Sequence, residues 1–194
     1  MNTKHIKRVS LSALTLALGL GVSVPGFAQQ DMGTDHTVMV GGAAMYPNKT
    51  IVQNAMNSKD HTTLVAAVKA AGLVDTLSGA GPFTVFAPTN EAFDALPKGT
   101  VDHLVKPENK ETLTKILTYH VVSGRYTAKD LMDLVAKGGG KASLTSVEGE
   151  PLTVMQAGNA LTVTDTKGGV AHVTIGDVMQ SNGVIHVVDK VLMP

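Results

Sequence analysis

Two apolar segments, far apart in the chain, constrain its fold more than any other feature. The first is the run Phe83–Ala87 inside the stretch Gly81–Phe93, and the second is the run Val184–Leu192 inside Ser181–Pro194. Both are rich in β-branched or aromatic residues and both are opened by a turn that contains glycine, which is typical of buried strands. A chain with two such strands is expected to bring these distant parts together in one core.

Most of the helical patterns precede most of the strand patterns. We expect helices over residues 50–57, 60–71, 89–95, 101–105 and 108–118, and another that begins at a capping box of Thr127 and Asp130. Asp60 is the expected N-cap of the second helix, and Gly72 follows its end. We expect strands over residues 83–87, 119–123, 144–147, 152–156, 161–165, 170–175 and 184–192. Helices first and strands afterwards favour an α+β domain over alternating βαβ units.

The N-terminus has the pattern of a secretory signal peptide. Lys4, Lys7 and Arg8 precede an apolar run over residues 9–24, and small residues lead to a cut after Ala28. The apolar run is shorter than the roughly 18–20 residues that span a membrane. We therefore expect a signal peptide over residues 1–28 and a protein exported to the periplasm or the extracellular space.

The exported part is expected to have two regions. Residues 29–47 show neither a helical nor a strand period and are predicted to form a flexible, extended arm. Residues 48–194 are predicted to form one domain, since a chain of this length suits a single core. The chain has no cysteine, so this core must be stable without disulfides.

Charge excludes one class of partner. The expected signal peptide carries three of the 16 basic residues and none of the 16 acidic ones, which leaves 13 basic against 16 acidic residues after cleavage. Arg125 is then the remaining arginine. Nucleic-acid binding needs clustered Lys and Arg, so DNA and RNA are not expected partners.

Two histidines lie inside apolar runs and raise the question of catalysis. His120 lies in Tyr119–Val122, and His186 lies in Ile185–Val187. We interpret both as core residues whose ring nitrogens are hydrogen-bonded. The alternative is an envelope hydrolase, which would need one of these imidazoles beside a serine or a carboxylate in a cleft.

A second alternative is copper binding by the N-terminal arm. Thioether and imidazole ligands suit copper, and the arm contains such residues at Met32, His36, Met39 and Met45. Methionine is also ordinary apolar filler, and the pattern indicates no other cofactor.

Asp177 follows a glycine and lies between apolar residues. An Asp in such a turn usually accepts hydrogen bonds from nearby backbone N–H groups. An exposed Asp at this place could instead dock with a cation held by a receptor.

Three motifs together resemble the fasciclin-domain family. The segment Phe83–Phe93 resembles its first signature, Tyr119–Val122 resembles its central Tyr-His motif, and Ser181–Pro194 resembles its second signature. The single-domain plan is similar to small secreted bacterial members such as the mycobacterial secreted immunogenic proteins. The resemblance implies a wedge of two β-sheets with helices packed around it.

The same resemblance implies an extracellular binding or adhesion role without catalysis. The expected partner is a cell-surface protein, a matrix protein or a polysaccharide. By resemblance, Tyr119, His120 and Asp177 are the candidate binding residues. Val178 stands where animal relatives have isoleucine after this Asp.

Overall fold

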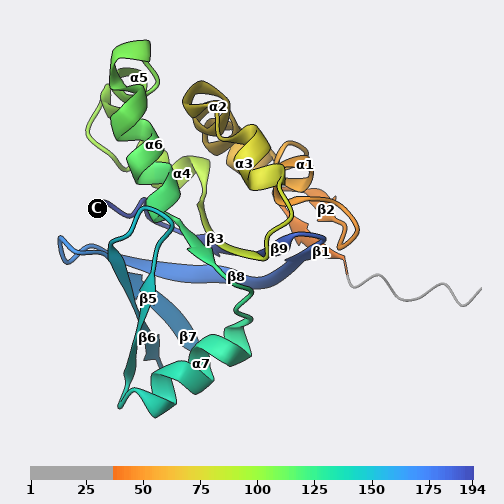
Figure 1. Cartoon of the computed structure of the whole chain (residues 1–194), viewed down its shortest axis with the longest axis vertical. Helices are drawn as coiled ribbons and strands as arrows, with labels where there is room; N and C mark the ends of the chain where they lie inside the picture. Colours follow the sequence, from red (N-terminus) through yellow and green to blue (C-terminus); the bar gives the residue numbers. More distant parts are fainter. Residues whose placement is uncertain (1–36) are drawn as a thin grey trace, which may run out of the picture. The chain divides into compact units, whose positions relative to one another are not determined.

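The computed structural model describes residues 37–194, so the predicted signal peptide lies outside the described residues (Figure 1). Within that range, seven strands form one mixed sheet in the order β4-β3-β9-β8-β7-β6-β5. The strands are β3 (Phe83–Pro88), β4 (Val121–Ser123), β5 (Lys141–Thr145), β6 (Pro151–Ala157), β7 (Ala160–Thr164), β8 (Val170–Gln180) and β9 (Gly183–Val188).

The two apolar segments lie side by side at the centre of this sheet. Strands β3 and β9 pair in parallel, from Phe83 opposite Gly183 to Pro88 opposite Val188. Gly183 permits this close approach, because a Cβ there would lie 2.1 Å from the carbonyl oxygen of Phe83. The prediction that distant parts of the chain meet through these two segments is confirmed.

Strand β8 bends the sheet into a wedge. Its pairing with β9 shifts register between Val173 and Ile175 and again between Ile175 and Val178, and such bulges increase the local bend and twist. Strands β4, β3 and β9 lie on one side of β8, and β7, β6 and β5 lie on the other. The far edges approach each other at a bridge between Val122 and Ser146. The expected α+β wedge is confirmed, with its two halves joined through β8 into one seven-stranded sheet, and β8 runs beyond the predicted end at Ile175.

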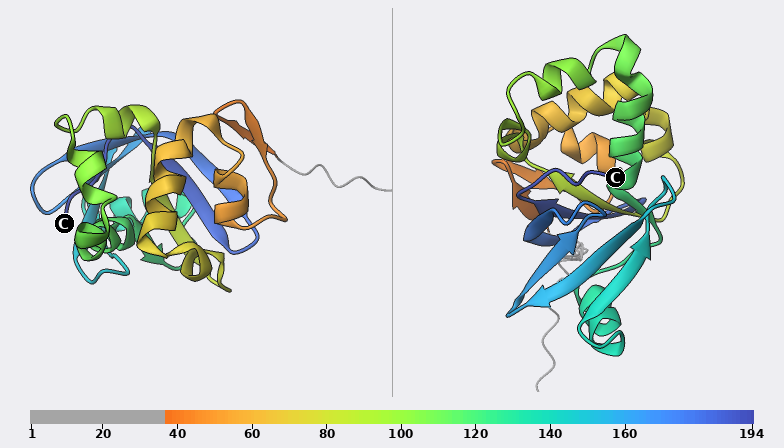
Figure 2. Two further views of the ribbon diagram at one scale, coloured as in Figure 1. Left: turned by 90° about the horizontal axis from the view of Figure 1, so that it is seen from above. Right: turned by 90° about the vertical axis from the view of Figure 1, so that its left-hand side faces the viewer.

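Helices cover the wedge from two sides. They are α1 (Ile51–Ala55), α2 (Thr62–Ala71), α3 (Val74–Ser78), α4 (Asn90–Asp94), α5 (Thr100–Leu104), α6 (Lys110–Tyr119) and α7 (Ala128–Lys137). Two short 3₁₀ turns, Lys59–His61 and Pro107–Asn109, precede α2 and α6. Figure 1 shows α1–α6 on one side of β3, β8 and β9, with α7 on the opposite side, and Figure 2 shows the same layers from above. None of the helices within residues 37–194 is both long and apolar enough to cross a membrane.

This arrangement produces two apolar clusters. One lies between α1–α6 and the strands β3 and β9, and includes Leu64, Val85 and Ile185. The other fills the wedge and is covered by α7, whose fully buried Leu131 packs with Leu152 of β6. The predicted α+β domain therefore has apolar packing on both sides of its central strands.

The predicted flexible arm is wrong over residues 38–45. Strands β1 (Val38–Val40) and β2 (Ala43–Met45) form an antiparallel hairpin. Gly41 and Gly42 both have positive φ, 59° and 74°, as a tight two-residue hairpin turn requires. Val40 and Met45 are 3% exposed and belong to the first cluster, so the packed region begins before the expected boundary at residue 48.

Two local predictions also need correction. Asp60 does not cap α2, because the helix begins at Thr62 after the uncapped His61. The side-chain oxygen of Asn90 accepts from the backbone N–H of Thr63 instead, at 3.0 Å. Tyr119 is the last residue of α6 rather than the first of a strand. By contrast, the predicted capping box before α7 is present.

Candidate functional site

Tyr119 lies in the interior rather than on a binding surface. Its exposed fraction is 0%. The phenol donates a hydrogen bond to the carbonyl oxygen of Pro151 at 2.9 Å and accepts one from the backbone N–H of Thr166 at 3.2 Å. Burial raises the pKa of this phenol. Tyr119 therefore joins the end of α6 to the start of β6 and to the segment after β7.

His120 is also interior, with 2% of its surface exposed. Its Nδ1 lies 2.8 Å from the carbonyl oxygen of Ile116, and its Nε2 lies 3.0 Å from the backbone N–H of Leu192. The partners define a neutral ring that donates from Nδ1 and accepts at Nε2. Burial lowers the pKa of His120 to about 4. The interpretation of His120 as a hydrogen-bonded core residue is confirmed.

His186 is held in the same way on β9. It is 0% exposed, and its Nε2 donates to the carbonyl oxygen of Tyr126 at 2.8 Å. Its Nδ1 accepts from the backbone N–H of Asp177 at 3.4 Å. Burial lowers the pKa of His186, against the opposing effects of the Tyr126 carbonyl and the Asp177 carboxylate. This ring also stacks on Phe86, with 5.7 Å between centroids.

Asp177 lies in the bend of β8, where it has a φ of 55° that is uncommon outside glycine. It is half-buried, and its Oδ1 accepts from the backbone N–H of Ala128 at 2.6 Å. That N–H belongs to the first turn of α7, where an anionic acceptor is favourable. The carboxylate therefore fixes α7 to the sheet, which agrees with the prediction that it holds a backbone N–H group.

A Ser–His contact that the sequence reading did not single out lies beneath the β1–β2 hairpin. Ser58 Oγ and His61 Nδ1 are 2.9 Å apart, but the two residues are 2% and 3% exposed. Among the residues that the structure describes, His61 Nε2 has no hydrogen-bond partner, so no carboxylate there orients the ring. Burial lowers the pKa of His61. Within residues 37–194, the hydrogen bonds of His61, His120 and His186 therefore form no Ser-His-carboxylate arrangement.

The two copper-ligand candidates that the structure describes, Met39 and Met45, do not lie on the same face of the β1–β2 hairpin. Met32 and His36 lie outside the described residues. Met45 pairs with Val38, so Met39, one residue further along β1, points to the other face of the hairpin. Met39 is 59% exposed and Met45 is 3% exposed. Within residues 37–194, moreover, no three His, Asp or Glu side chains are grouped as metal ligands.

Asn182 is a structural residue that the sequence reading missed. It is 6% exposed, and its Oδ1 accepts from the backbone N–H of Ile51, the first residue of α1, at 3.0 Å. Its Nδ2 donates to the carbonyl oxygens of Leu77 at 2.8 Å and Gly79 at 2.9 Å. The Asn182 side-chain amide thus hydrogen-bonds one backbone N–H at the start of α1 and two backbone carbonyl groups around the end of α3. The feature of the sequence that could have indicated this role is the Asn182-Gly183 pair at the start of the second apolar segment.

No helix within residues 37–194 covers the outer side of strands β5–β8. Cross-strand register aligns Ser143, Thr153, Thr164 and Val170 in one row and Lys141, Met155, Thr162 and His172 in the next. We call these two rows the open face. The right-hand view in Figure 2 shows β5, β6 and β7 with no helix in front of them.

The open face combines exposed apolar side chains with hydroxyl-bearing residues, of which Thr153 and Thr164 are half-buried and Thr162 is buried, at 6% exposed. Met155 and Val170 are each 41% exposed, and Lys141 and His172 are exposed as well. The alternate residues of the same strands, among them Val154 and Val163, point into the wedge and are 0% exposed. The strands therefore present one buried face and one face available to a partner.

Comparison with known proteins identifies the family. The sequence profile described as "Fasciclin domain" matches residues 59–194, and the chain belongs to this family. "Protein sll1483" of Synechocystis sp. is 47% identical over 185 residues, which cover 94% of each chain. "Immunogenic protein MPB70" of Mycobacterium bovis is 39% identical over 145 residues, which cover 72% of this chain and 66% of that protein.

A solved structure confirms the fold. The FAS1 domain pair of the insect cell adhesion molecule Fasciclin I superposes with a TM-score of 0.69 and 20% identity, over 77% of this chain and 52% of that chain. The resemblance to fasciclin domains and to mycobacterial immunogenic proteins, predicted from three motifs, is confirmed. The insect protein that contains this domain pair is described as a cell adhesion molecule.

Proposed function

We propose that this protein is an exported, non-catalytic binding module of the adhesion type. Its partner is a cell-surface or extracellular-matrix protein or polysaccharide. Family membership supports the class of function by analogy with an adhesion molecule of the same fold. The open face is the observation that carries the proposal on this chain, because it is a two-row surface that no helix in the described part of the chain covers.

In this proposal the candidate binding residues Tyr119, His120 and Asp177 have a structural role in the interior and do not contact the partner. Tyr119 and His120 are 0% and 2% exposed, so neither can supply contact area to a partner. Asp177 is half-buried and already holds α7 through one carboxylate oxygen. In this proposal these residues keep the wedge rigid, and the partner contacts the exposed side chains of the open face.

The chemistry of the open face favours a protein partner over a polysaccharide. Met155 and Val170 expose apolar surface between hydroxyl-bearing residues, and methionine is enriched in adaptable protein–protein contacts. The cationic Lys141 lies at the edge strand β5 and leaves the centre of the face with little charge. An extended, weakly charged surface of this kind can be covered by another protein.

Two substitutions test this assignment as a matched pair. Met155→Glu places a charge at the centre of the open face, and Met39→Glu places the same charge on the exposed side of the β1–β2 hairpin. The purified proteins are compared by interferometry on purified matrix proteins and by glycan array. We expect saturable binding to a protein that Met155→Glu weakens at least tenfold and Met39→Glu leaves unchanged. Absence of binding in both formats would contradict the proposal.

Export is tested separately. The proposed cut after Ala28 predicts that the protein recovered from the periplasm or medium begins at Gln29. N-terminal sequencing by mass spectrometry measures this directly. A chain that keeps Met1 and stays with the membrane fraction would contradict it.

A further inference from the structure

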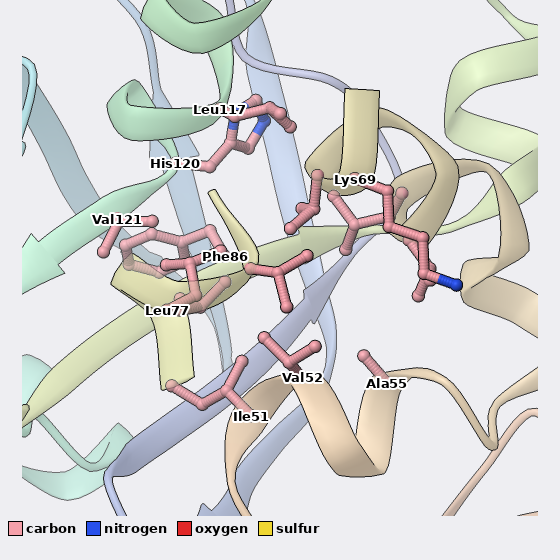
Figure 3. A pocket seen from close by; sticks show the side chains of 14 residues that line it. Ile51, Val52, Ala55, Lys69, Leu77, Phe86, Leu117, His120 and Val121 are labelled. Carbon is pink, nitrogen blue, oxygen red and sulfur yellow. The ribbon is translucent and has the colours of Figure 1, made fainter. Parts of the chain in front are cut away.

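A small cavity lies between helices α1, α2, α3 and the end of α6 and strands β3 and β4. Its volume is about 40 Å³. The deep wall includes Phe86, Leu117 and His120, which are 0%, 4% and 2% exposed. The mouth includes the half-buried Ala55 and the exposed Lys69. Figure 3 shows these side chains around the cavity, with α1 and α2 on either side of it.

The interior of this cavity offers no hydrogen bond to a guest. Among the lining residues, polar side-chain atoms belong to His120 and Lys69 alone, and both ring nitrogens of His120 already have partners. Apolar cavities of this kind exclude water and accept apolar molecules. The part of any ligand that enters must therefore be aliphatic.

The volume limits the length of that aliphatic part. A water-sized group needs roughly 10–15 Å³ on this measure, so about 40 Å³ holds roughly three groups of methylene size. The remainder of a longer ligand would lie between Ala55 of α1 and Lys69 of α2, at the mouth. A much longer alkyl chain would exceed the volume of this cavity.

The mouth supplies a cation. Lys69 lies in the last turn of α2, and Figure 3 shows its Nζ turned away from the cavity. The ion pairs within residues 37–194 involve Lys115 and Lys129, so no described carboxylate neutralises Lys69. The exposed Lys69 side chain would have to turn toward the mouth for this ammonium group to meet an anionic head group there.

We propose that the cavity is a binding site for a short-chain aliphatic carboxylate of four to six carbon atoms. The alkyl end lies against Phe86 and Leu117, and the carboxylate pairs with Lys69. This site is separate from the open face, since it lies among α1, α2 and α3.

Methyl-resolved NMR titration of the purified protein with pentanoate tests the proposal. We expect saturable shifts of the Val52, Val68 and Leu117 methyl groups, and an affinity that increases from propanoate to pentanoate and falls for octanoate. Pentanol has the same alkyl part without the charge, and it should bind at least fivefold more weakly. Absence of shifts at millimolar pentanoate would overturn the proposal.

Three substitutions assign the contacts. Ala55→Leu fills the mouth with a good helix former and should abolish the shifts. Lys69→Met should weaken pentanoate at least fivefold and leave pentanol unchanged. Lys137→Met removes a lysine from the last turn of α7, a helix of the same length, and should change neither ligand. Equal effects of Lys69→Met and Lys137→Met, or full binding by Ala55→Leu, would overturn it.

Discussion

His120 makes the stability of this protein depend on pH in a way that one substitution can isolate. The folded protein holds the ring neutral with a pKa of about 4, below the value of 6.5 for an exposed histidine. The unfolded chain therefore binds more protons between those two values, and stability falls as pH decreases from about 6.5 to about 4. The shift corresponds to about 3 kcal/mol over the whole window and to about 2 kcal/mol between pH 7 and pH 4.5.

His120→Gln removes the titration and preserves part of the geometry. A glutamine oxygen can accept from the N–H of Leu192 in place of Nε2, whereas the bond to the carbonyl oxygen of Ile116 is lost. That loss costs about 1 kcal/mol at pH 7. The variant should be less stable at pH 7 but should lose about 2 kcal/mol less than the wild type on going to pH 4.5.

Urea denaturation followed by circular dichroism at pH 7 and pH 4.5 measures both differences. The pKa values of His61 and His186 are also lowered by burial, but these groups are present in both proteins and cancel in the comparison. Equal losses of stability in wild type and variant would refute the assignment of a buried, neutral His120.

Two further substitutions test the hydrogen bonds that organise the wedge. Asp177→Ala should destabilise the protein by about 1–2 kcal/mol, because it removes the acceptor for the Ala128 N–H. Asp177→Asn keeps an acceptor and tolerates the positive φ, so it should cost less. Urea midpoints that fall equally for the two variants would contradict this. Asn182→Ala leaves the backbone groups of Ile51, Leu77 and Gly79 without their hydrogen-bond partner. Thermal unfolding should therefore show a loss of about 2–4 kcal/mol in the free energy of unfolding. An unchanged melting temperature would argue against this role of Asn182.

The central strands were predictable because their signal is local. Phe83–Pro88 and Gly183–Val188 are apolar except for the buried Thr84 and His186, as is typical of strands covered on both faces. The box of Thr127 and Asp130 likewise forms within one turn. The β1–β2 hairpin was missed although Gly41-Gly42 between short apolar runs was visible, because runs of three residues show too little alternation.

The roles of the site residues could not be predicted from local pattern. Asp177 meets the N–H of a residue 49 positions away, and His120 meets one 72 positions away. The open face depends on cross-strand register, which places Ser143, Thr153 and Thr164 in one row only after the wedge has formed. Such contacts follow from topology rather than from spacing along the chain.

The central claim is that the motif residues support the wedge while the open face contacts the partner. Its most direct test is the affinity for one bound partner, measured at pH 7 for Met155→Glu, Met39→Glu and His120→Gln side by side. The account predicts at least tenfold weaker binding for Met155→Glu and unchanged affinity for the other two. Weakened binding by folded His120→Gln, with Met155→Glu unaffected, would contradict it.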